Sequence, residues 1–211
     1  VLYWMVATRR LGWSFALDRA VAHAEELAKP LLILEPIDVS YRWASDRHHR
    51  AILDGMREHR GALEGSAVGY HPYVEPEPDA GAGLLRTLAG RACVLVTDDS
   101  PVFFTPRLLE AAGRVAPCRA EAVDSCGLLP LGATDRAFTT AYSFRRFLQK
   151  TLPGHLLDTP SADPLARGRL AAFSGLPAEV RERWRAADAE LLEGDASAAR
   201  QRSLTSAGSP E

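Results

Sequence analysis

The chain has 211 residues, of which 46% are hydrophobic and 25% are charged, and its formal net charge at pH 7 is -2. This composition is typical of a globular domain, and the small net charge excludes a global attraction to nucleic acid or to an acidic membrane surface. No apolar run reaches the roughly 18 residues that cross a bilayer, so the sequence predicts no membrane contact.

The first half of the chain alternates short apolar runs with longer amphipathic segments, which is the βαβ pattern. Buried parallel strands are predicted for the apolar runs, at 1–7, 31–37 and 67–74. Helices are predicted between the strands, at about 13–29 and 45–64. Ser14 and Ser45 are the expected N-caps, because each serine precedes a segment with apolar residues at helical spacing. A Pro- and Gly-rich surface loop is predicted at 75–83.

The second half continues this alternation. Strands are predicted at 92–98 and 118–124, and helices at 84–88, 105–116 and 135–152. Thr105 and Asp135 are the expected N-caps of the two longer helices, and Pro153 is expected to end the last one. Beyond Pro153 the sequence predicts a loop, one helix over 177–194, and a polar, disordered tail at 195–211.

These elements predict an α/β fold with a doubly wound, Rossmann-like sheet of five parallel strands and a short helical C-terminal extension. Right-handed crossovers give the strand order 3-2-1-4-5. Ligands of such sheets bind beyond the carboxyl ends of the strands where the order reverses, here between the first and fourth strands. The residues following these strands are the candidate cofactor-binding residues Thr8, Arg9, Arg10, Asp98, Asp99 and Ser100. The sequence contains neither GxGxxG nor GxxxxGKS, which argues against a common dinucleotide or P-loop site.

Each candidate residue has two interpretations. The guanidinium groups of Arg9 and Arg10 suit an anionic cofactor tail or a phosphate, but solvated surface charge at the end of a strand is the more common role of such residues. Asp98 and Asp99 can bind a ring nitrogen or a ribose hydroxyl, or they can cap the turn that follows the strand. No catalytic and no metal-ligating residue is predicted.

Six short motifs are each weak evidence for a family, but their combined order and spacing along the chain are hard to obtain by chance. They are YWM at 3–5, WSFAL at 13–17, RHHRAILDGM at 47–56, VTDDSP at 96–101, EAVDSCGLLPL at 121–131 and AYSFRRFL at 141–148. Together they resemble the N-terminal α/β domain of the DNA photolyase and cryptochrome family, most closely the class II cyclobutane pyrimidine dimer photolyases, over about residues 1–157. The sequence departs from the family at 12–14, where the family has Asp-Asn, and near Cys126, where an Asn is expected.

The resemblance implies a light-driven DNA repair protein whose reduced FAD donates an electron to split a pyrimidine dimer. The N-terminal domain of such a protein holds an antenna chromophore, a deazaflavin, a folate or a flavin, which passes excitation energy to the FAD. Energy transfer needs a fixed distance and orientation and no acid–base group, which agrees with the lack of predicted catalytic residues.

In this family the FAD and the damaged DNA belong to a helical domain that follows the α/β domain, and no such domain is recognised in this chain. The resemblance therefore implies a fragment, inactive alone, that docks on an FAD domain, with 158–194 as the linker and helix leading toward it. The alternative is a stand-alone nucleotide- or partner-binding module without light chemistry. Cys93, Cys118 and Cys126 lack CxxC spacing, which predicts a reducing, cytoplasmic location.

Overall fold

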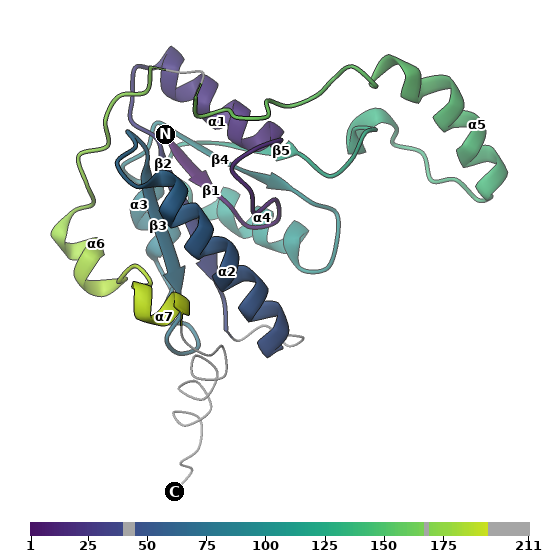
Figure 1. Ribbon diagram of the computed structural model, residues 1–211. Coiled ribbons are helices and arrows are strands. Elements are labelled where there is room, and N and C mark those ends of the chain that lie inside the picture. The colour runs from purple at the N-terminus through teal and green to yellow at the C-terminus, as the bar shows by residue number, and fades with distance from the viewer. Residues whose placement is uncertain (40–44, 167–168, 194–211) are drawn as a thin grey trace, which may run out of the picture.

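A five-stranded parallel sheet in the order β3-β2-β1-β4-β5 forms the centre of the computed structural model, which describes residues 1–39, 45–166 and 169–193 (Figure 1). The strands are β1 (Leu2–Trp4), β2 (Leu32–Ile37), β3 (Gly69–Val74), β4 (Val94–Asp99) and β5 (Arg119–Asp124). The predicted fold class and strand order are confirmed. The first strand is shorter than predicted, because the amides that follow it turn toward Asp98.

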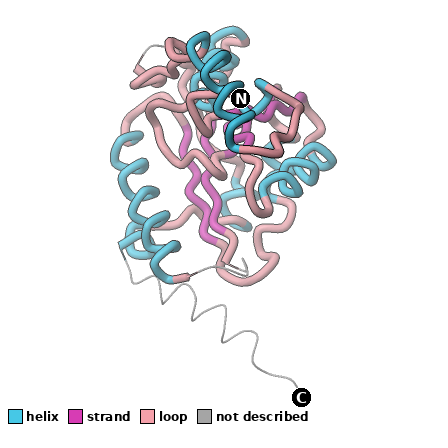
Figure 2. The backbone as a smooth tube through the Cα atoms, turned by 90° about the vertical axis from the view of Figure 1, so that its right-hand side faces the viewer, coloured by secondary structure: helices cyan, strands magenta, loops and turns pink. Residues whose placement is uncertain are grey.

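Helices cover both faces of this sheet (Figure 2). They are α1 (Phe15–Glu26), α2 (Asp46–Leu63), α3 (Leu84–Ala89), α4 (Thr105–Val115), α5 (Ala141–Thr151), α6 (Ala178–Arg183) and α7 (Ala189–Glu193), with 3-10 turns at Leu131–Ala133 and Leu152–Gly154. Alternate strand residues face opposite layers: Tyr3 packs toward α1, whereas Leu2 and Trp4 pack toward α3, α4 and α6. The two layers of buried side chains make the sheet the rigid platform of the protein.

The predicted N-caps are confirmed for the first two helices and wrong for two later ones. Ser14 Oγ accepts the Leu17 amide at 3.2 Å, and Ser45 Oγ accepts the His48 amide at 3.3 Å. Thr105 is already inside α4, whose N-cap is Phe104 and has no side-chain cap. Asp135 lies before a stretch without helix, and α5 begins only where Thr140 Oγ1 accepts the Ser143 amide at 3.2 Å.

The single helix predicted over 177–194 is also wrong, since α6 and α7 are separated at Trp184. The Trp184 side chain is buried in the layer beneath α3, and its Nε1 donates to the Ala80 carbonyl at 3.1 Å. The Ala187 amide donates to the carbonyl of Pro72 in the edge strand β3 at 2.8 Å. Both contacts require the backbone to leave the helix, so packing against β3 outweighs the helical periodicity.

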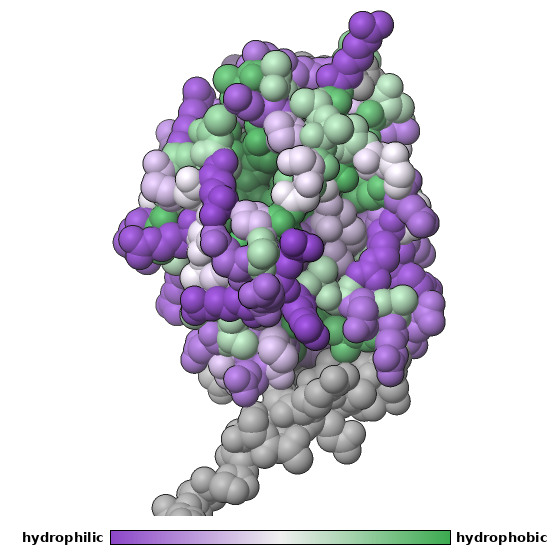
Figure 3. All heavy atoms as spheres, turned by 90° about the vertical axis from the view of Figure 1, so that its left-hand side faces the viewer, coloured by the Kyte–Doolittle hydropathy of each residue, from purple (hydrophilic) through white to green (hydrophobic). Residues whose placement is uncertain are grey.

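The described part of the C-terminal segment therefore lies on the α/β body, where it first passes α1 and then follows the β3 edge of the sheet (Figure 1). The Ser161 amide donates to Asp18 Oδ2 at 2.7 Å, and the Phe173 amide donates to the Ala67 carbonyl at 2.8 Å. The face that carries α6 and α7 is largely hydrophilic, with apolar patches between the charged groups (Figure 3). The tail predicted at 195–211 lies outside the described residues.

Helix α5 differs from the other long helices because it stands away from the sheet (Figure 1). None of its residues is buried, although its apolar and basic residues separate onto different faces. Phe138 lies 5.3 Å from Phe144 and 5.0 Å from Phe147, measured between ring centroids, so these rings pack on one another. None of the described helices combines the length and the apolar character needed to cross a bilayer.

Candidate functional site

The crevice predicted between β1 and β4 is closed by the carboxylate of Asp98, which is fully buried. Asp98 Oδ2 accepts the backbone amides of Val6, Ala7 and Thr8 at 3.0, 2.8 and 3.0 Å. Asp98 Oδ1 accepts the Tyr3 hydroxyl at 2.9 Å. Successive amides that converge in this way form a nest for an anion, and here the protein supplies the anion itself. Asp98 therefore caps the turn after β1 and is not free to bind a ligand.

The Tyr3 hydroxyl is the fourth donor to this carboxylate. Burial raises the pKa of Tyr3, and the charge of Asp98 raises it further. The hydroxyl therefore stays protonated and can act as the donor at any pH at which the fold is stable. This buried pair ties β1 to β4 at the point where the strand order reverses.

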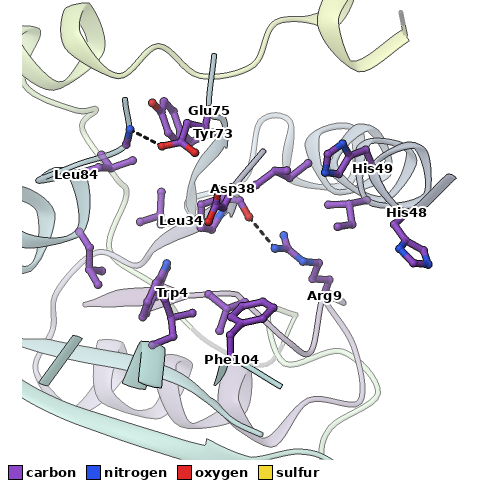
Figure 4. A pocket seen from close by; sticks show the side chains of 17 residues that line it. Trp4, Arg9, Leu34, Asp38, His48, His49, Tyr73, Glu75, Leu84 and Phe104 are labelled. Atoms are coloured by element: carbon purple, nitrogen blue, oxygen red, sulfur yellow. Dashed lines mark hydrogen bonds between the residues drawn. The ribbon is translucent and has the colours of Figure 1, made fainter. Parts of the chain in front are cut away.

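A pocket of about 540 Å³ opens instead beside the carboxyl ends of β1, β2 and β3, between α2, α3 and α4 (Figure 4). Its volume falls within the range of small-molecule sites, about 300–1,000 Å³. Apolar and aromatic side chains form most of its wall, among them Trp4, Leu34, Tyr73, Leu84, Phe104 and Leu108. Among the residues that the structure describes, Arg9, Asp38, His48, His49 and Glu75 are its charged or titratable groups. A flat, mostly apolar molecule with a polar edge suits such a lining.

Arg9 is held at the pocket wall by a buried polar cluster. Its Nη1 donates to Glu35 Oε1 at 3.1 Å, and its Nη2 donates to the Pro36 carbonyl at 2.7 Å (Figure 4). The Glu35 carboxylate is fully buried and also accepts His59 Nδ1 at 2.8 Å and the Tyr70 hydroxyl at 2.6 Å. A buried carboxylate needs such partners, because an unpaired one would cost several kcal/mol, on the order of 3 to 5.

The partners of Glu35 keep it ionised in spite of its burial. Burial acts to raise the pKa of Glu35, but the hydrogen bond from His59, the charge of Arg9 and the hydrogen bond from Tyr70 together lower it. The same contacts raise the pKa of Tyr70, where burial contributes most and Glu35 adds to it. The cluster is therefore a fixed ion pair whose guanidinium faces the pocket.

A second carboxyl group, Glu75, lies at the opposite side of the pocket. Glu75 Oε1 accepts the Gly81 amide at 2.9 Å (Figure 4), and the carboxyl group of Asp38 is close enough to Glu75 to affect its pKa. Burial raises the pKa of Glu75, the Gly81 amide lowers it, and Asp38 raises it, with a net rise. Burial and the neighbouring carboxyl group therefore favour the protonated form of Glu75 more than in an exposed glutamate.

Of the six candidate residues from the sequence, the structure places only Arg9 in the pocket lining. The Arg10 side chain is exposed and does not line the pocket, and Thr8 contributes its amide to Asp98. Ser100 is buried, and Cys126 Sγ donates to the Asp99 carbonyl next to it at 3.3 Å. The six residues surround the β1–β4 junction, and the pocket lies beside it.

Sequence reasoning missed Glu75, Asp38 and the aromatic wall of the pocket. Phe104 was not recognised as a pocket residue because it lies in the loop immediately before the helix that was expected to begin at Thr105. Glu75 was assigned to a Pro-rich surface loop, although it follows β3 directly and is only 7% exposed. An acidic residue immediately after a buried strand was the signal available in the sequence.

The comparisons with known proteins agree with this architecture. No described protein family matches the chain. The chain is 26% identical over 153 residues to the deoxyribodipyrimidine photo-lyase of Methanothermobacter thermautotrophicus, which covers 72% of this chain and 34% of that protein. The chain therefore spans about a third of the length of this curated relative.

Solved structures show the same fold. The archaeal photolyase of Sulfolobus tokodaii, solved with two FAD molecules, matches with a TM-score of 0.54 and 9% identity, over 77% of this chain and 36% of that chain. A universal stress protein in complex with cAMP overlaps 59% of this chain and 98% of its own, but its TM-score of 0.33 supports no argument. The chain is thus similar in sequence to part of one photolyase, and its fold is similar to part of another, in agreement with the resemblance seen in the sequence motifs.

Proposed function

We propose that this domain holds a light-harvesting chromophore in the pocket beside β1, β2 and β3, and passes its excitation energy to the FAD of a pyrimidine dimer photolyase. The observation that carries the proposal is the 540 Å³ pocket with aromatic walls on a photolyase-type sheet. The structure of the Sulfolobus photolyase, which contains two FAD molecules and implies a novel light-harvesting cofactor, supports a flavin-type ligand. Within a photolyase, cleavage of the dimer and contact with damaged DNA belong to the complete protein.

The residues of the pocket fit an aromatic chromophore. Trp4, Tyr73 and Phe104 supply ring faces that can stack on a flat heterocycle. Arg9 supplies guanidinium donors from one side, and Glu75 and Asp38 supply oxygen atoms from another. Rigid stacking between fixed side chains holds a chromophore at a constant orientation, which is what energy transfer requires.

The test is retention of a chromophore by the purified chain. The protein is incubated separately with FAD, FMN, riboflavin, a deazaflavin and a folate, separated from unbound ligand, and its near-ultraviolet and blue absorption spectrum is recorded. Retention of at least one ligand with a shifted band is expected. A domain that retains none would contradict the light-harvesting function and would favour the stand-alone partner-binding module.

A matched pair of variants locates the bound ligand. Phe104→Ala removes a ring from the pocket wall and is expected to raise the Kd about tenfold, the effect of losing one aromatic contact. Phe103→Ala removes the neighbouring ring, which is 83% exposed and does not line the pocket, and should leave the Kd unchanged. Equal effects of the two variants would place the ligand elsewhere.

We propose further that α5 and the turn after it contact the FAD-binding part of a photolyase. Tyr142, Phe144 and Leu157 are 61%, 43% and 92% exposed, which is unusual for large apolar groups gathered on one segment. A second cavity of about 590 Å³ has Leu157 on its wall, together with Leu128 and His155. The stand-alone alternative predicts instead that the chain binds no photolyase domain.

A further inference from the structure

Two of the three cysteines meet at the start of neighbouring strands. All three cysteines carry free thiols. Cys93 directly precedes Val94, the first paired residue of β4, and Cys118 directly precedes Arg119, the first paired residue of β5. Val94 and Arg119 are register partners in a parallel pair, so the same register places Cys93 beside Cys118 at the amino edge of the sheet.

Strand geometry turns both side chains to the same face of the sheet. Cys118 packs against the buried layer that contains Leu95 and Ala112. Cys93 lies two residues before Leu95, and side chains two residues apart in a strand point to the same side. Burial raises the pKa of Cys118, and Cys93 is close enough to raise it further. Cys93 is exposed and Cys118 is half-buried, so a small ion can reach the pair from solvent.

The spacing of the pair suits a bridging ion better than a disulfide. Neighbouring strands lie about 4.8 Å apart, and side chains in register on parallel strands keep about this separation. A disulfide needs its two Cβ atoms about 3.8 Å apart, so the strand ends would have to move together. Two metal–sulfur bonds of about 2.3 Å each span about 4.6 Å, which matches the strand spacing without a backbone shift.

The number and the kind of the ligand atoms determine which ion fits. Thiolate sulfur is a soft ligand, and it selects soft ions such as copper(I). A structural zinc site ordinarily has four ligands. Within 1–39, 45–166 and 169–193, no three or more histidine, cysteine or acidic side chains are grouped so that they could hold a metal ion. The cysteine pair therefore suits a soft ion that accepts two ligands.

We infer that Cys93 and Cys118 form a two-thiolate site for one soft monovalent cation of the copper(I) type. Binding breaks the two S–H bonds, forms two metal–sulfur bonds and releases two protons to solvent, and no group is oxidised or reduced. The bound ion ties the start of β4 to the start of β5. The site is independent of the proposed light-harvesting function, because the pocket lies beside the carboxyl ends of β1, β2 and β3.

The test is a titration of the full chain, kept reduced and free of oxygen, with copper(I) in competition with a coloured copper(I) chelator of known affinity. One ion per chain and a release of about two protons per ion are expected from the two thiols, which are ordinarily protonated at neutral pH. X-ray absorption at the copper edge should show two sulfur neighbours. Zinc(II) at equal concentration should not displace copper(I), because two thiolates leave zinc short of its four ligands.

Serine variants assign the ion to the named thiols. Cys93→Ser and Cys118→Ser should each weaken copper(I) binding at least about a hundredfold, since losing even an outer partner of a metal ligand costs about 10–100-fold. Cys126→Ser is the matched control, because Cys126 is also exposed but follows β5 at the opposite edge of the sheet. It should leave the affinity unchanged. Circular dichroism verifies that each variant is folded.

Three outcomes would overturn the inference. Equal losses of affinity in Cys126→Ser and Cys93→Ser would show that copper(I) binds to exposed thiols in general. One ion per two chains would show that thiols of different copies share the ion. One tightly bound ion in the folded double variant Cys93→Ser/Cys118→Ser would place the copper(I) site elsewhere in the chain.

Discussion

The β1–β4 junction and the pocket beside β1, β2 and β3 lie at the same carboxyl edge of the sheet. They differ in how completely their polar groups are hydrogen-bonded within the protein. At the junction every donor of the turn is bound by Asp98 or by the turn itself. At the pocket Arg9 and Glu75 are only partly enclosed by protein partners and face a cavity of about 540 Å³. Topology thus places a crevice along this edge, and one buried carboxylate determines which part of it stays open.

The largest expected effect is that of Asp98→Ala, which leaves three amides and the Tyr3 hydroxyl without an acceptor. The free energy of unfolding should fall by about 3–4 kcal/mol, since hydrogen bonds to a buried charge contribute more than neutral ones. Urea denaturation followed by circular dichroism measures it. Asp99→Ala, which removes the neighbouring half-buried carboxylate, should cost less than about 1 kcal/mol.

The effect of added anions on the stability of Asp98→Ala tests whether the turn after β1 is an anion-binding nest. Without the Asp98 carboxylate, the nest of amides should accept sulfate, and sulfate should stabilise Asp98→Ala more than the unchanged protein. Sodium chloride at equal ionic strength is the control for general salt effects. Equal stabilisation of both proteins by sulfate would contradict the description of this turn as an anion nest.

A smaller loss is expected for Glu35→Gln, about 2 kcal/mol at neutral pH, because the amide keeps one acceptor and loses the ion pair with Arg9. The pKa of Glu35 is lowered in the folded protein, so its carboxylate stabilises the fold above its ordinary pKa. This contribution is lost as the pH falls through the folded pKa. The variant should therefore show a weaker loss of stability on acidification, measured by urea denaturation at several pH values, and an unchanged pH slope would contradict this account.

Glu75→Gln is expected to act in the opposite direction. The pKa of Glu75 is raised in the folded protein, so its contribution to stability is present below its ordinary pKa and is lost as the pH rises through the folded pKa. The glutamine imitates the protonated form and should increase the free energy of unfolding at neutral pH by less than about 1 kcal/mol. Thermal unfolding at acidic and neutral pH measures it, and a destabilised variant at neutral pH would show that ionised Glu75 is needed by the fold.

Leu157→Ser, which changes a residue shortly after α5, is expected to have the smallest effect on the stability of the fold. Its side chain is 92% exposed, so the free energy of unfolding should change by less than about 0.5 kcal/mol. The variant should nevertheless weaken binding to a separately produced part of the Methanothermobacter photo-lyase that lies outside the 153 matched residues, measured by calorimetry. Glu110→Gln, on the exposed side of α4, is the control. Unchanged binding by Leu157→Ser would contradict the proposed contact.

Much of the fold could be predicted because its signals are local. Ser14 and Ser45 cap helices through hydrogen bonds that span only three residues, and the apolar runs mark strands covered on both faces. Predictions failed where distant partners compete for the backbone. Trp184 interrupts a periodic helix because its indole donates to Ala80, about a hundred residues earlier in the chain.

The site was predictable only as a region. Arg9 was correctly placed at the carboxyl edge, because the strand order follows from the βαβ alternation. Its partner Glu35 could not be assigned from the sequence, since a glutamate within an apolar strand shows no sign of the cation that neutralises it. Phe104, Glu75 and Asp38 come from loops after different strands, and only folding brings them to one cavity.

The sequence by itself determined the α/β class, the strand order and the likeness to photolyases. Hydrophobic periodicity, helix caps and short motifs all depend on residues that are close together in the sequence. The tertiary structure alone decided that Asp98 fills the anion nest and that Glu35 neutralises Arg9. Both pairings join residues that are tens of positions apart, and buried charge is stable only where such partners meet. The open pocket follows from these pairings.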